Sequence, residues 1–201
     1  MLRSFRKELT HLEISSPFTV RNYAFIHYPK VRFVRFEEEF IDHTIVALTD
    51  AYPKLRELEW IPQEESVDAN VKFAEKTRAR NRRQFDSSNQ DPDAMGEWES
   101  LDRLHANLIR TYAMGLRCHI AFWEGVFLQT QKHVPLLRAV LEDIRPTSLS
   151  LRVNLNAVDI KQLSKALRSP STTHFRIVLR FGPGLKVKPS KFLKFLVRRM
   201  P

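Results

Sequence analysis

The feature that most constrains this chain is a short pattern of apolar residues that recurs along it. The stretches Tyr28-Pro-Lys-Val-Arg-Phe-Val-Arg-Phe36 and Tyr52-Pro-Lys-Leu-Arg-Glu-Leu-Glu-Trp60 align without gaps at a spacing of 24 residues. Both place apolar side chains in the order h-x-x-h-x-h, and the same order occurs in Leu9-Thr-His-Leu-Glu-Ile14, 22 residues before the first copy. Self-similarity at such a period is the signature of a repeat architecture, so we expect one supersecondary unit per copy.

The spacing within each copy predicts a strand. The last two apolar positions are two residues apart, so on an extended chain both point to the same face. Pro29 and Pro53 precede these strands, where the missing N–H costs least. Between the copies, apolar residues at helical spacing predict a helix over 40–52, with Asp42 or Thr44 as its N-cap. Each period therefore reads as strand, turn, helix and turn, and neighbouring units bury one another's apolar strips.

The second half shows a looser form of the same pattern. Copies that begin at Ile120, Pro146 and Thr172 follow one another at 26 residues, and the last two continue to Leu149 and Phe175. Apolar residues at helical spacing predict helices over 134–144, 158–167 and 190–199.

The middle of the chain interrupts this rhythm. Residues 61–97 are polar, and we expect them to form an insertion or flexible loop outside the stack, with 67–84 as a solvated helix. Trp98, Leu101, Leu104, Leu108 and Tyr112 then predict an amphipathic helix that leads back into it. The whole of 1–201 is predicted to be a single α/β domain, a leucine-rich-repeat solenoid of about six units with parallel strands on one face and helices on the other.

Several segments resemble a known family. Glu97-Trp-Glu-Ser-Leu-Asp-Arg-Leu-His105, Tyr112-Ala-Met-Gly-Leu-Arg-Cys118 and Leu137-Arg-Ala-Val-Leu-Glu-Asp-Ile-Arg-Pro-Thr-Ser-Leu-Ser-Leu151 are similar to segments of the F-box and leucine-rich-repeat proteins of basidiomycete fungi. In that family an F-box docks on the adaptor of a cullin–RING ubiquitin ligase, and the repeats hold a substrate. Only eight residues precede Leu9, so we expect no F-box here and no adaptor binding by this chain alone. The resemblance implies substrate recognition in ubiquitin transfer, with an unidentified protein as the partner.

Residues capable of catalysis form no recognisable group. Cys118 and His119 are adjacent, and neighbours on a strand point to opposite faces, so a buried structural thiol is expected. The seven histidines show no metal-binding spacing. We therefore expect no enzyme activity and no cofactor. Apolar runs are too short for a secretory signal or a membrane span, which predicts an intracellular protein, cytoplasmic or nuclear.

Charge is distributed unevenly and suggests where partners bind. Residues 145–201 contain 13 Lys and Arg but only Asp159 as an acid. For protein binding we predict outward side chains on the strand face, namely Arg32, Arg35, Glu37, Arg56, Glu57, Glu59 and Arg152. An alternative function is binding of nucleic acid or an acidic surface by the basic C-terminal quarter. A second basic run could also contact nucleic acid through Lys76, Arg78, Arg80, Arg82 and Arg83.

Overall fold

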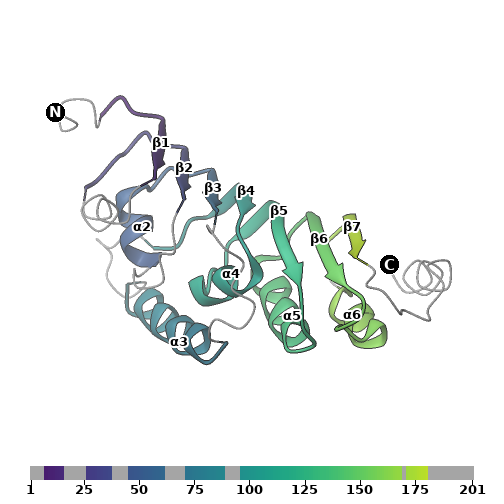
Figure 1. Cartoon of the computed structure of the whole chain (residues 1–201). Helices are drawn as coiled ribbons and strands as arrows, with labels where there is room; N and C mark the ends of the chain where they lie inside the picture. The colour runs from purple at the N-terminus through teal and green to yellow at the C-terminus, as the bar shows by residue number, and fades with distance from the viewer. Residues whose placement is uncertain are drawn as a thin grey trace.

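The strands of the molecule form one parallel sheet. The structure, a computed structural model, describes residues 7–15, 26–37, 45–61, 71–88, 96–168 and 171–180. Within them seven strands pair in chain order, each parallel to the next (Figure 1). The strands are β1 (His11–Ile14), β2 (Phe33–Phe36), β3 (Glu57–Trp60), β4 (Ser100–His105), β5 (His119–Leu128), β6 (Ser148–Asn154) and β7 (His174–Arg180).

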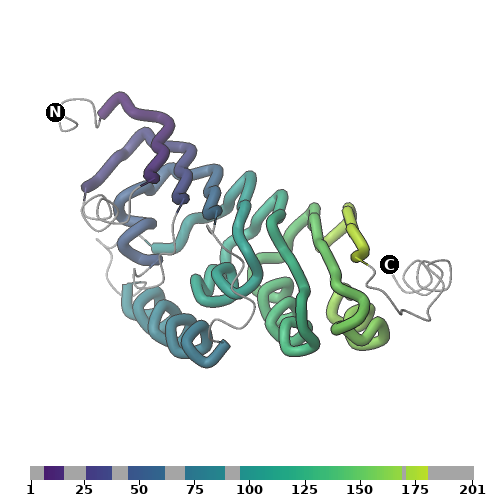
Figure 2. The backbone as a smooth tube through the Cα atoms, viewed as in Figure 1, coloured from purple at the N-terminus to yellow at the C-terminus, as the bar shows by residue number. Residues whose placement is uncertain are grey.

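Helices make the return connections from β2 onward. They are α2 (Ile45–Ala51), α3 (Val71–Ser88), α4 (Leu108–Met114), α5 (His133–Ile144) and α6 (Ile160–Ala166). Parallel neighbours need such crossovers, because the chain must return to the starting edge before each new strand. The helices lie along one side of the row of strands, and the other side carries none among the described residues (Figures 1 and 2).

The strand register confirms the predicted alignment of the repeats. Leu12 pairs with Val34 and Val34 with Leu58, while Ile14, Phe36 and Trp60 follow in the same order. In the second half Trp123, Leu149 and Phe175 are also in register, so the 26-residue spacing identified corresponding positions. The predicted helices of 134–144 and 158–167 correspond to α5 and α6, whereas the predicted helix of 190–199 lies outside the described residues.

The core lies between the sheet and the helices. Val34, Leu58, Leu101 and Leu149 are almost completely buried, and the facing helices supply residues such as Leu137. Complete burial of one such side chain stabilises the fold by about 1.5–3 kcal/mol. Because each strand touches only its two neighbours in the sheet, this core extends through the molecule as one strip.

Aromatic residues at corresponding positions of successive repeats also pack against each other, just before the strands begin. The rings of Tyr28 and Tyr52 are stacked, with centroids 5.7 Å apart and planes inclined by 14°. Trp98 follows at the equivalent place, three residues before a buried Leu, and its indole N–H donates to the Tyr52 carbonyl at 2.9 Å. In these three units the aromatic residue at this position links neighbouring units.

The structure corrects two expectations about the middle of the chain. Residues 71–88 form α3, which packs against α4 and buries Phe85 completely, so this part of 61–97 is neither a flexible loop nor a solvated helix. The helix predicted from Trp98 to Tyr112 is wrong: 100–105 is strand β4, and only 108–114 is helical. Leu101, Leu104 and Ala106 are a further copy of the h-x-x-h-x-h order, and all three are completely buried.

Candidate functional site

The side of the sheet away from the helices presents side chains in rows. Parallel pairing places outward residues of neighbouring strands opposite one another, and inward and outward positions alternate except near the start of some strands and at one irregularity in β5. One row runs from Phe33 through Glu57 and Arg103 to Phe122. We call this side of the sheet the strand face. Its extent across seven strands, free of any described helix, makes it the main candidate surface for binding.

Charges on the strand face are compensated between β3 and β5. Arg103 of β4 lies between Glu59 of β3 and Glu124 of β5, with 3.3 Å to the Glu59 carboxylate and a 2.7 Å hydrogen bond from its Nε to Glu124. The bond with Glu124 raises the pKa of Arg103 above its ordinary value. His105 Nδ1 lies 3.9 Å from the same Glu124 carboxylate. In this cluster two carboxylates surround one guanidinium, so Arg103 is fully paired across three strands.

A bulge in β5 positions Glu124 for this cluster. Three steps along β5, from Trp123 to Val126, are matched by only two steps on β6, so one extra residue is accommodated at Glu124–Gly125. Gly125 has a φ of +85°, and a Cβ there would lie 2.7 Å from the His105 ring. A residue with a side chain is strained by both effects. Glycine therefore allows Glu124 to face outward while Val126 still turns into the core.

Beyond the bulge the strand face is basic. The outward side chains of β6 and β7 include no carboxylate; they are Ser148, Ser150, Arg152, Asn154, His174, Arg176, Val178 and Arg180. Arg152 is in register with Phe127 on one side and with Val178, which is 42% exposed, on the other. The guanidinium of Arg180 lies 5.0 Å from the centre of the Phe127 ring. No ion pair within the described residues involves any of the three arginines. We call Arg152, Arg176, Arg180, Phe127 and Val178 the basic patch.

The predicted protein-binding residues are all near the strand face, in different settings. Arg32 and Arg56 are exposed just before β2 and β3, and Arg56 donates to the Ser100 hydroxyl at 3.3 Å. Arg35 of β2 pairs with Glu37, which follows that strand, at 3.2 Å. Glu57 is half-buried and Arg152 is exposed.

Glu59 differs from the other predicted binding residues. It is only 9% exposed and is occupied by Arg103. It therefore serves the cluster of β3–β5 and is poorly placed to contact a partner directly.

The structure places the predicted nucleic-acid-binding residues of α3 in different environments. Arg78 is 8% exposed; it donates to the Tyr112 carbonyl at 2.9 Å, lies 4.3 Å from the Tyr112 ring centre and pairs with Asp143 of α5. Arg82 also pairs with Asp143. As a correction, Arg78 is not a nucleic-acid contact, because its donors are buried against α4 and α5.

The other three cations of that set have different surroundings. Lys76 and Arg83 are exposed, and Arg83 donates to the Ala79 carbonyl of its own helix at 3.2 Å. Arg80 is half-buried in a hollow beside Val46 of α2. The five cations therefore do not form one continuous basic surface, and only Lys76 and Arg83 are fully open to solvent.

The sequence pattern did not predict which arginines pair with carboxylates and which stay unpaired. Arg103 and Glu124 were not predicted to interact, and Asp143 was expected on an exposed side of its helix, yet these residues decide which arginines are neutralised. One signal was available: Leu101 follows Leu55 by 46 residues with the same apolar order, which places Arg103 beside Glu57 and near Glu59.

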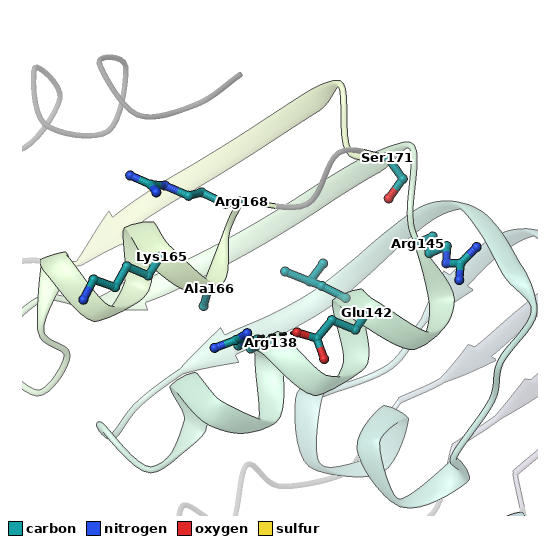
Figure 3. Close-up of a pocket in the computed structure, with 8 residues that line it drawn as sticks. Arg138, Glu142, Arg145, Lys165, Ala166, Arg168 and Ser171 are labelled. Atoms are coloured by element: carbon teal, nitrogen blue, oxygen red, sulfur yellow. Dashed lines mark hydrogen bonds and ion pairs between the residues drawn. The ribbon is translucent and has the colours of Figure 1, made fainter.

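A hollow of about 670 Å³ lies between the C-terminal ends of α5 and α6 (Figure 3). Figure 3 shows that Lys165 and Arg168 extend toward the opposite end from Arg145, so these cations do not converge on one point. Glu142 accepts a hydrogen bond from Arg138 at 2.9 Å. Cations near the C-terminus of a helix offset its dipole, which accounts for their presence here. The lining residues are Arg138, Leu141, Glu142, Arg145, Lys165, Ala166, Arg168 and Ser171.

The environment of Cys118 opposes nucleophilic chemistry. Burial, followed by the nearby carboxylate of Glu97, raises the pKa of the Cys118 thiol to about 12, so the thiol is protonated at neutral pH. The neighbouring His119 is exposed and hydrogen-bonds with the Thr147 hydroxyl at 3.1 Å, away from the buried sulfur. Thiolate, the reactive form, is therefore scarce at neutral pH.

The described residues show neither a metal-binding cluster nor a membrane-spanning helix. No three His, Cys, Asp or Glu side chains in those segments gather closely enough to hold a metal ion. No helix in the same segments has the length and apolar character needed to cross a lipid bilayer.

Comparison of the chain with protein-family models, curated proteins and solved structures found no match in any of the three.

Proposed function

We propose that this chain is a leucine-rich-repeat-like solenoid that binds a protein partner on its strand face. One observation carries the proposal: outward side chains lie in register across seven parallel strands, and no described helix covers them. Surfaces of stacked repeats act as extended binding faces, because each unit adds one more strip of side chains. The function needs no catalytic group, no metal and no cofactor.

The resemblance to F-box leucine-rich-repeat proteins extends this proposal to a biological role. By analogy with that family, the bound protein is a substrate for ubiquitin transfer. In that family the ligase adaptor binds the F-box, whereas the substrate binds the repeats. The analogy concerns the repeats only and transfers no residue roles from the family.

Affinity capture with paired variants tests the proposal. Arg32 and Arg56 are exposed at the entry to β2 and β3, so Arg32→Glu/Arg56→Glu reverses two charges beside the strand face with little effect on packing. Lys161 and Arg168 are exposed on the helix side, and Lys161→Glu/Arg168→Glu is the matched control. The partner should be lost with the first variant and kept with the second. Capture that survives Arg32→Glu/Arg56→Glu but is lost with Lys161→Glu/Arg168→Glu contradicts the proposal.

A second candidate function is favoured by the basic C-terminal part of the described chain. Seven Lys and Arg lie between residues 145 and 180 against Asp159, and Asp159 is occupied in capping α6 at 2.9 Å from the Gln162 amide. Unpaired cations bind phosphate chains, and such binding weakens steeply with salt. A titration of single-stranded RNA with increasing NaCl measures this. Absence of RNA binding at low salt removes this candidate.

A further inference from the structure

The arginines of β3–β5 and those of β6 and β7 differ in whether the chain itself supplies a carboxylate partner, and this difference indicates the kind of partner. On β3–β5 of the strand face the arginine is neutralised by carboxylates of the chain itself. On β6 and β7 the three arginines of the basic patch have no such partner in the described residues. An exposed cation next to apolar groups is best satisfied by an acidic group from another molecule.

The spacing of the basic patch suits an extended peptide. Arg176 and Arg180 are four residues apart on β7, or about 13 Å along a strand at ~3.3 Å per residue. Arg152 lies on the neighbouring strand, in register with Val178 between them, about 4.8 Å away. Three positive charges therefore surround one exposed apolar side chain within a few residue lengths.

Apolar groups in the same row favour a peptide over a nucleic acid. Val178 is 42% exposed and shares a row with Phe127 and Arg152. The Phe127 ring already packs against the Arg180 guanidinium, which makes it a poor platform for stacking a base. The remaining cations of 145–180 lie on the helices or in the turns beside them, so they do not extend this patch into a track for a phosphate chain.

We infer that the basic patch binds an acidic peptide segment of the protein partner, with an apolar side chain of that segment contacting Val178 and Phe127. This inference rests on the proposed function, because it names the partner chemistry for one part of the strand face. It assigns Arg152, Arg176 and Arg180 as the residues that select acidic over neutral sequences.

Fluorescence anisotropy of the full chain with a labelled peptide of alternating Glu and Phe tests the inference. The same peptide with Gln in place of Glu measures the role of charge, and a single-stranded RNA of equal length is the competing ligand. The wild-type chain should bind the acidic peptide at least about tenfold more tightly than the neutral one, which is a modest electrostatic preference. Tighter binding of the RNA than of the acidic peptide overturns the inference.

Matched variants locate the binding. Arg152→Gln/Arg176→Gln/Arg180→Gln should weaken peptide binding about tenfold or more, whereas Lys161→Gln/Lys165→Gln/Arg168→Gln removes the same charge from the helix side and should change it less than about twofold. All six residues are exposed, and circular dichroism verifies that each variant is folded. Equal loss in both variants overturns the inference, because net charge alone then explains the binding.

The two proposals fail in different ways. If capture of the natural partner depends on Arg32 and Arg56 but is unaffected by the triple change in the basic patch, the inference is wrong and the proposed function stands. If the partner is captured through the helix side, the proposed function is wrong, regardless of the affinity measured for the acidic peptide.

Discussion

The middle of the chain and its C-terminal part use cations in opposite ways. Between residues 78 and 117 four arginines are bonded to carboxylates: Arg78, Arg82, Arg103 and Arg117. Between residues 145 and 180 seven Lys and Arg form no ion pair with the described residues. Paired charges join neighbouring units inside the stack, whereas unpaired charges remain accessible to another molecule. A high content of arginine therefore does not by itself indicate a binding surface; the carboxylates that surround each arginine decide.

The largest effect in this comparison is expected for Arg78→Ala. The change removes the donor to the Tyr112 carbonyl and one of two partners of Asp143, whose side chain is 15% exposed. Loss of one member of a buried pair costs about 3 kcal/mol. Urea denaturation followed by circular dichroism measures this change in the free energy of unfolding. The double variant Arg78→Met/Asp143→Asn should recover part of the loss, and a loss below about 1 kcal/mol for Arg78→Ala contradicts a structural role.

A smaller loss is expected for Arg103→Ala on the strand face. Glu59 and Glu124 are left without a cation while mostly buried, although Arg103 itself is 39% exposed and solvent screens part of the interaction. We expect about 2 kcal/mol of destabilisation in the same urea experiment. Glu59→Gln/Arg103→Met/Glu124→Gln removes the charges together and should cost less than Arg103→Ala alone. A greater loss of unfolding free energy in the triple variant than in Arg103→Ala contradicts the role of unpaired carboxylates in this destabilisation.

The boundary between the two regions is tested by Gly125→Ala. The positive φ and the contact of a Cβ with the His105 ring should cost about 1–2 kcal/mol. Adding His105→Ala relieves the ring contact and leaves the backbone strain and the close approach to the Ala106 carbonyl, so the double variant should be more stable than Gly125→Ala. Thermal unfolding by differential scanning fluorimetry ranks the two variants. Equal melting temperatures for Gly125→Ala and the unaltered chain contradict the described bulge.

The smallest effect is expected for Arg152→Ala. Arg152 is exposed and has no carboxylate partner in the described residues, so the free energy of unfolding should change by no more than about 0.5 kcal/mol. Urea denaturation beside Arg103→Ala provides the direct contrast between an unpaired and a paired arginine of the same face. A loss comparable with that of Arg103→Ala removes the distinction between the two regions.

Much of the fold was predictable because its signal is periodic. Pairs such as Val34 and Leu58 could be placed in register from the sequence, since inward positions recur at a constant offset. The prediction failed around β4, where Trp98, Leu101, Leu104 and Leu108 also satisfy helical spacing. Short apolar stretches fit both periods, and only the length and the neighbouring strands distinguish them.

The candidate site was less predictable than the fold. Outward positions such as Arg35 and Glu57 follow from the alternation of a strand and were identified correctly as lying on the strand face. The exposure of each charge did not follow, because Glu59 is covered by Arg103 and Arg78 by Asp143. The latter pair is separated by 65 residues, so no local pattern contains it.

The sequence by itself determined the repeated unit, its period and most of the residues that face the core, because the spacing of apolar residues along a strand or helix is a local pattern. Only the tertiary structure decided which charges are neutralised and which face solvent. Ion pairs form between side chains brought together by stacking, and their energies depend on burial and distance, which the order of residues along the chain does not contain.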